Sequence, residues 1–198
     1  MKYIDTDVDI DFADRNVALS QLPHIDAMID RDGKATRHPS GVYFQNIPVD
    51  PLTDLAAYDY EKAPELGFIK VDFLNNSIYA CVRDEEHLER LMAEPDWDLF
   101  LIRDLVEGTE RTPKLAHVGD HFGLLQMIRP RSVEELAICV ALIRPGKCHL
   151  IGKPMDEIKK EIWLPTTDYY YKKPHAIAYA MSIIVQVNLI VEQLSQEA

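Results

Sequence analysis

Two aspartates near the start of the chain, Asp7 and Asp9, have the spacing of a shared metal site. They lie two residues apart in the segment TDVDIDF, residues 6–12. On a strand, residues two apart project from the same face, about 7 Å apart along the backbone. Mg²⁺ prefers oxygen ligands and commonly binds one or two carboxylates together with substrate phosphates. Two such ions about 3.5–4 Å apart can clamp an in-line phosphoryl displacement, so the spacing indicates phosphoryl transfer.

A third carboxylate is expected from a neighbouring strand, and Asp72 in the segment KVDF, residues 70–73, is the candidate. Lys70 lies two residues before Asp72, on the same face of such a strand, where its ammonium can neutralise a phosphate. We therefore expect Asp7, Asp9 and Asp72 to be catalytic and to bind two Mg²⁺ or Mn²⁺ ions.

The same alternation has a simpler interpretation. Residues 3–12 alternate between apolar and acidic side chains over most of their length, and a row of aspartates can serve only as the solvated face of an edge strand. Charged edge strands are common because they discourage aggregation through the open edge. From spacing alone, both interpretations stay open.

The elements that must position these residues are strands in the first part of the chain and helices afterwards. Alternation predicts strands over 3–12, 41–49 and 67–73, and a short helix is expected around 16–29. Helical periodicity predicts helices over 76–82, 84–94, 96–107, 120–128, 132–143 and 154–163, and from residue 174 onward. This order predicts an α+β fold, a small mixed sheet with helices packed on one face. We expect a single domain over 1–198, with a strand-rich acidic part, 1–74, and a helical part, 75–198.

The charge and composition limit the classes of function. The chain has 198 residues and a net charge of −12, which disfavours nucleic-acid binding by the chain alone. Residues 1–110 carry 24 acids and 10 bases, whereas residues 111–198 carry 9 acids and 11 bases, so a polyanion would approach the second part more easily. Three scattered cysteines and an acidic amino terminus indicate a cytoplasmic protein. The apolar stretch 176–191 is interrupted by polar residues, so no membrane partner is expected.

Five segments, in order, resemble the bacterial replicative DNA polymerase III alpha subunit, a C-family DNA polymerase. That family has a PDxDxDF strand followed by arginine, a HxGGV segment, a GLxKxDFLGL strand, an acidic helix ending in ALxRPGP, and a KKSHAxAY segment. The corresponding segments here are TDVDIDF (6–12) with Arg15, HPSGV (38–42), GFIKVDFL (67–74), ALIRPGK (141–147) and KKPHAIAY (172–179).

The resemblance implies a polymerase-beta-like nucleotidyltransferase palm in which Asp7, Asp9 and Asp72 bind the two metal ions. It also implies that Lys70, Arg144 and Lys173 face the nucleotide or DNA. The substrates would be a DNA primer-template and a deoxynucleoside triphosphate. The chain departs from the family in its short length, which leaves no room for the fingers and accessory domains. We therefore expect a minimal palm, of a size that would suit a phage gene, that works with replication proteins or a second polymerase subunit.

Two further functions fit the same residues. A catalytically inactive palm remnant could bind a replication protein or form a homodimer through the apolar last helix. A nuclease or another phosphoryl transferase could use the same carboxylates, because a carboxylate–metal site does not specify its substrate.

Overall fold

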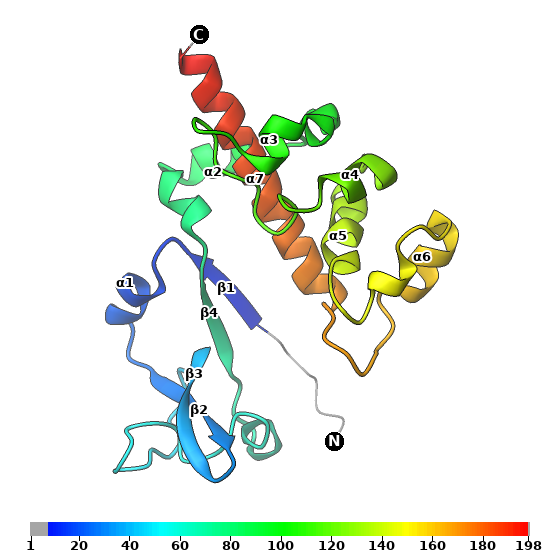
Figure 1. Ribbon diagram of the computed structural model, residues 1–198. Helices are drawn as coiled ribbons and strands as arrows, with labels where there is room; N and C mark the ends of the chain where they lie inside the picture. The colour runs from blue at the N-terminus through cyan, green and yellow to red at the C-terminus, as the bar shows by residue number, and fades with distance from the viewer. Residues whose placement is uncertain (1–7, 198) are drawn as a thin grey trace. The chain divides into compact units, whose positions relative to one another are not determined.

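The four strands found among residues 8–197 form one mixed sheet in the order β1-β4-β3-β2. The computed structural model describes residues 8–197 (Figure 1). Strand β1, Val8–Phe12, pairs in parallel with β4, Val71–Asn75. Strand β3, Lys34–Tyr43, pairs antiparallel with both β4 and β2, Ile25–Arg31. A helix, α1, Arg15–Ser20, follows β1 and begins at the capping side chain of Asp14.

The hairpin of β2 and β3 contains a bulge that interrupts the pairing. Met28 pairs with Arg37 but Asp26 pairs with Val42, so β3 carries extra residues around Pro39. Proline cannot donate to a ladder hydrogen bond, and a bulge is one of the few places in a sheet that accepts it. The bulge also turns the carbonyls of this segment away from the ladder, where other groups can bind them.

The chain divides into two compact units, Met1–Cys81 and Val82–Ala198. The second unit holds α2 to α7, so the described residues contain seven α-helices with the sheet's four strands, an α+β fold. Its helices are α2 (Glu85–Leu91), α3 (Arg103–Glu107), α4 (Phe122–Ile128), α5 (Val133–Leu142), α6 (Met155–Glu161) and α7 (Lys173–Glu197). Short 3₁₀ turns, among them η2 (Ser77–Cys81) and η3 (Trp97–Leu101), connect the elements.

Helices α5 and α7 form the centre of the second unit. Every residue of α5 from Leu136 to Leu142 is buried, and Ile183, Ile184 and Val187 of α7 belong to the same hydrophobic cluster. Helix α5 begins where the Ser132 hydroxyl accepts a hydrogen bond from the Glu135 amide at 3.2 Å. A helix with apolar residues on nearly all sides is stable only when other elements surround it.

The polar residues of α7 attach neighbouring segments to this core. The Gln186 side chain accepts a hydrogen bond from the Ala116 amide at 2.8 Å and donates to the Lys114 carbonyl at 3.0 Å. The Asn188 side chain donates through Nδ2 to the carbonyls of Leu91 and Ala93 at 2.8 and 3.1 Å. Buried polar groups need such partners. The polar residues that interrupt the apolar sequence of α7 therefore hold loops of the second unit in place.

Among the described residues, α7 has the length and apolar composition of a membrane-spanning helix over Lys173–Gln196. In its most apolar window, 56% is buried within the fold. A core helix of a globular domain meets the same criteria.

The order of strands before helices agrees with the sequence-based expectation, but several boundaries differ. The helix expected over 16–29 ends at Ser20, and residues 25–31 form β2 instead. The strand expected over 41–49 lies over Lys34–Tyr43, and the strand expected over 67–73 lies over Val71–Asn75. The helix expected over 76–82 is the 3₁₀ turn η2. Residues 96–107 divide into η3 and α3.

The burial of α5 gives a direct test of the second unit. We expect Leu136→Ala, at a fully buried position, to lower the free energy of unfolding by about 2–5 kcal/mol, because it leaves a cavity. Tryptophan fluorescence during urea denaturation reports on this unit, since Trp97 and Trp163 both lie in it. Met127→Ala, at a position 56% exposed on α4, should change the free energy of unfolding by less than about 0.5 kcal/mol. Equal losses in the two variants would contradict this core.

Candidate functional site

The pairing of β1 with β4 brings two of the predicted acidic residues together. In this parallel ladder Asp9 is the register partner of Asp72. Partners on adjacent strands project from the same face and lie about 5 Å apart. The sheet therefore places side by side two carboxylates that are 63 positions apart in the sequence. The third predicted ligand, Asp7, lies outside the described residues.

Asp72 is largely buried and both of its carboxylate oxygens are bound. Only 9% of the residue is exposed. Its Oδ1 accepts a hydrogen bond from the Ser40 hydroxyl at 2.6 Å, and its Oδ2 contacts the Lys70 ammonium. A charge removed from water needs such partners. Lys70 thus lies on the predicted face beside Asp72.

The Lys70 side chain follows a path that only glycine at position 41 leaves open. Gly41 is the register partner of Asp72 across β3 and β4. A Cβ at Gly41 would lie 2.7 Å from Lys70 Cδ and 2.9 Å from His38 Nδ1, closer than real Cβ atoms approach. The Lys70 Nζ also lies 5.8 Å from the centre of the Tyr60 ring, within reach of a cation–π interaction.

His38 lies beside the same carboxylate as a neutral ring. Its Nδ1 accepts hydrogen bonds from the amides of Gly41 and Ser40 at 2.8 and 3.3 Å, so the ring proton is on Nε2. Burial, with the positive charge of Lys70, lowers the pKa of His38. The 3.7 Å separation between His38 Nδ1 and Asp72 Oδ1 is therefore a packing contact, because backbone donors already occupy the nitrogen.

Arg15 ties the bulge to the end of β4. Its backbone amide donates to the Asn75 side chain at 2.7 Å, and its guanidinium contacts the carbonyls of Pro39 and Ser40. Asn76 donates to the Asp11 carboxylate at 3.2 Å. Arg15 thus fixes the segment that carries Ser40, whose hydroxyl binds Asp72.

The other two predicted binding residues, Arg144 and Lys173, lie in the second unit. The Arg144 guanidinium stacks on the Tyr171 ring at 4.2 Å and approaches His117 Nδ1 at 3.3 Å. Lys173, the first residue of α7, contacts Glu134 at 2.7 Å and lowers the pKa of that carboxyl. Their approach to the aspartates of the first unit stays a prediction.

Residues 8–197 contain no group of three or more histidine, cysteine, aspartate or glutamate side chains arranged to hold a metal ion. The part of the site that they contain, Asp9 beside Asp72, matches the one or two carboxylates that Mg²⁺ commonly takes from a protein. The residues present therefore fit the ion as a partial ligand set.

Comparison with known proteins gives no assignment, since no family model, curated protein or solved structure matches the chain. The site must be judged on its own geometry.

Sequence reasoning placed Asp9 and Asp72 on neighbouring strands and Lys70 beside Asp72, as the structure has them, but it did not predict the contacts made by the bulge. Ser40 and His38 were noted only within the HPSGV segment, because a hydroxyl and an imidazole give no pattern that points to a distant carboxylate. The nearest signal is Pro39, two residues before the strand predicted over 41–49, because the few places in a sheet that accept proline include bulges.

The Lys70–Asp72 pair gives the test of this site. We expect Lys70→Met to destabilise the first unit by about 3 kcal/mol, because it leaves a buried carboxylate without its cation. Adding Asp72→Asn should recover part of this loss, since the uncompensated charge is then absent. Hydrogen exchange of the β3 and β4 amides measures the opening free energy of this unit.

The matched control is Arg37→Met, which removes an ion pair to Asp26 whose side chains are 52% and 22% exposed. Such a pair contributes less than about 1 kcal/mol. If Lys70→Met and Arg37→Met lowered the stability of the first unit equally, Lys70 would have no special role at Asp72.

Proposed function

We propose that this chain is a minimal polymerase palm that catalyses metal-dependent nucleotidyl transfer from a deoxynucleoside triphosphate to a DNA 3′-hydroxyl. The observation that carries the proposal is the register pairing of Asp9 with Asp72 on adjacent parallel strands. The resemblance of five ordered segments to C-family polymerases supplies the reaction class. We assign the fold of the first unit to the polymerase-beta-like nucleotidyltransferase palm on the same basis.

Each predicted residue has a role in this proposal. Asp7, Asp9 and Asp72 hold two Mg²⁺ or Mn²⁺ ions, which when bound lower the pKa of the attacking hydroxyl and offset the charge of the transition state. Ser40 keeps its hydrogen bond to Asp72 Oδ1 at 2.6 Å and so orients the carboxylate. Arg144 and Lys173 bind the triphosphate or the DNA backbone.

Lys70 has two positions in this proposal. Without metal its ammonium contacts Asp72 Oδ2 and compensates the buried charge. A divalent cation on Asp72 would supply that compensation, and the Lys70 ammonium could then bind a phosphate of the substrate. The flexible stem of lysine permits this exchange.

The net charge of −12 opposes binding of a primer-template by the chain alone. We therefore propose that replication proteins or a second polymerase subunit supply most of the DNA contacts. The three cysteines are free thiols, which supports a reducing compartment, and we place the activity in the cytoplasm without a membrane partner.

One observation favours a second function, that of an inactive palm remnant. Both oxygens of Asp72 are bound by donors of the same chain, Ser40 and Lys70. In a remnant these contacts are permanent, the carboxylate is part of the fold, and the chain acts by binding a replication protein or a second copy of itself.

The two functions differ in nucleotide binding and incorporation. We expect the wild-type chain with Mn²⁺ or Mg²⁺ to bind a fluorescent deoxynucleoside triphosphate and to add nucleotides to a primer-template. Asp9→Asn and Asp72→Asn should each lower incorporation by at least about a hundredfold, because one metal ligand is lost. Gel electrophoresis of a labelled primer measures incorporation.

The control is Asp14→Asn, which removes one charge but retains a residue that caps α1, and it should keep wild-type activity. If the wild-type chain showed neither metal-dependent nucleotide binding nor incorporation, alone or with added replication proteins, the polymerase proposal would be wrong. A complex with such a protein that survives Asp72→Asn would then support the remnant.

A further inference from the structure

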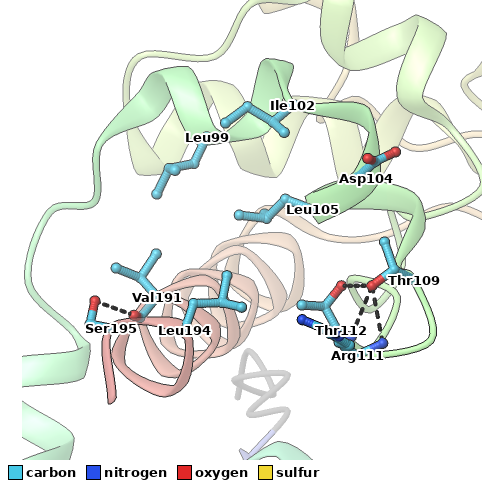
Figure 2. A pocket seen from close by; sticks show the side chains of 10 residues that line it. All are labelled: Leu99, Ile102, Asp104, Leu105, Thr109, Arg111, Thr112, Val191, Leu194 and Ser195. Atoms are coloured by element: carbon cyan, nitrogen blue, oxygen red, sulfur yellow. Dashed lines mark hydrogen bonds between the residues drawn. The ribbon is translucent and has the colours of Figure 1, made fainter. Parts of the chain in front are cut away.

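The second unit carries an open apolar groove of about 520 Å³ between the end of α7 and the segment containing η3 and α3 (Figure 2). Its walls are aliphatic: Leu99, Ile102 and Leu105 face Val191 and Leu194 across it. Ile102 is 48% exposed and Leu194 is 42% exposed. Exposure of aliphatic side chains to water is unfavourable, and an apolar partner that covers them removes this cost. The groove is therefore suited to an apolar occupant.

The three hydroxyls that line the groove bind each other or the backbone. The hydroxyls of Thr109 and Thr112 are 2.9 Å apart, and the Thr109 hydroxyl accepts from the amides of Arg111 and Thr112, each at 3.1 Å. The Ser195 hydroxyl donates to the Val191 carbonyl at 2.7 Å. A site for a small polar molecule needs convergent free polar groups, and these hydroxyls do not provide them.

The charge around the groove indicates what kind of apolar occupant it takes. The segment 82–112 supplies seven of the ten lining residues. This segment carries ten acids and four bases, a net charge of −6. Some of these acids already pair with the available bases, as Glu107 does with Arg103 and Glu86 with Arg90. Asp98 pairs with Arg131 outside this segment, and the lining itself holds one acid, Asp104, and one base, Arg111. The net negative charge of the segment favours a positively charged partner.

We propose that this groove binds a basic amphipathic helix of a partner protein, with the apolar face of the helix in the groove and its lysines or arginines toward the acidic surround. Helices dock in this way by placing apolar side chains at i, i+3 or i+4, and i+7 into a hydrophobic groove. The aliphatic walls supply affinity through burial, and the acidic surround attracts the partner and sets its charge preference. The proposal is independent of the metal chemistry assigned to the first unit.

A designed peptide tests this proposal. The probe is a fluorescein-labelled helix of about 18 residues, five turns, with leucine on one face and lysine on the other. Its control has the same composition in a scrambled order that forms no apolar face. Fluorescence anisotropy at physiological salt should show the amphipathic peptide binding at least about tenfold more tightly than the scrambled one, because only the former fills the groove.

A variant of the groove separates apolar docking from simple charge attraction. Leu194→Glu adds a negative charge, so attraction alone would leave binding unchanged or strengthen it, whereas docking in the groove predicts a loss of at least about tenfold. Met127→Glu adds the same charge at a 56% exposed position on α4 and should not weaken binding. Ile102→Glu, at the opposite wall, is a second variant for the case in which Leu194→Glu does not fold.

Three results would overturn the proposal. The first is equal affinity for the amphipathic and scrambled peptides, and the second is unchanged affinity in the folded Leu194→Glu and Ile102→Glu variants. The third is a wild-type dimer, detected by light scattering, that Leu194→Glu converts to a monomer, because the occupant would then be a second copy of this chain.

Discussion

The need to compensate the charge of one buried carboxylate, that of Asp72, determines the arrangement of the first unit. The carboxylate lies beside its register partner Asp9, and two neighbouring anions in a partly dry site repel each other. Lys70 supplies the opposing charge and Ser40 supplies a hydrogen bond. The glycine at 41 leaves space for the lysine stem, so strand pairing, bulge and glycine act together. The cation beside this carboxylate in the structure is the Lys70 ammonium, and the proposed function adds a metal ion at the same carboxylate.

The second unit is organised by a different constraint, the burial of two apolar helices. Helix α5 is enclosed by its neighbours, and α7 uses Gln186 and Asn188 to bind segments that would otherwise end in open backbone groups. These polar contacts place the loop at residues 114–116 and the end of α2 along α7. At the carboxyl end of α7 the covering stops, and the aliphatic groove with its acidic surround remains exposed. The two units thus present different chemistry, paired carboxylates in one and an apolar groove in the other.

Local patterns in the sequence predicted the helical part of the chain more accurately than the sheet. The helix predicted over 132–143 agrees closely with α5, whose start at the Ser132 cap depends on residues only three positions apart. The hairpin of β2 and β3 was not predicted, because the bulge and Pro39 break the alternation by which strands are identified. The neighbourhood of Asp9 and Asp72 was predicted, since alternation indicates the face of each strand. The Ser40 and His38 contacts depend on the bulge geometry and leave no local signal.

Binding of Mn²⁺, followed by electron paramagnetic resonance of the free ion, tests the central claim most directly, because it needs neither DNA nor a partner protein. Paired carboxylates on β1 and β4 predict that the wild-type chain removes Mn²⁺ from solution and that Asp9→Asn and Asp72→Asn each lower the affinity by at least about tenfold. Asp14→Asn should bind as the wild type does. Equal Mn²⁺ binding by the wild type and Asp72→Asn, or none by either, would contradict the assignment of Asp72 and its strand partner as a metal site.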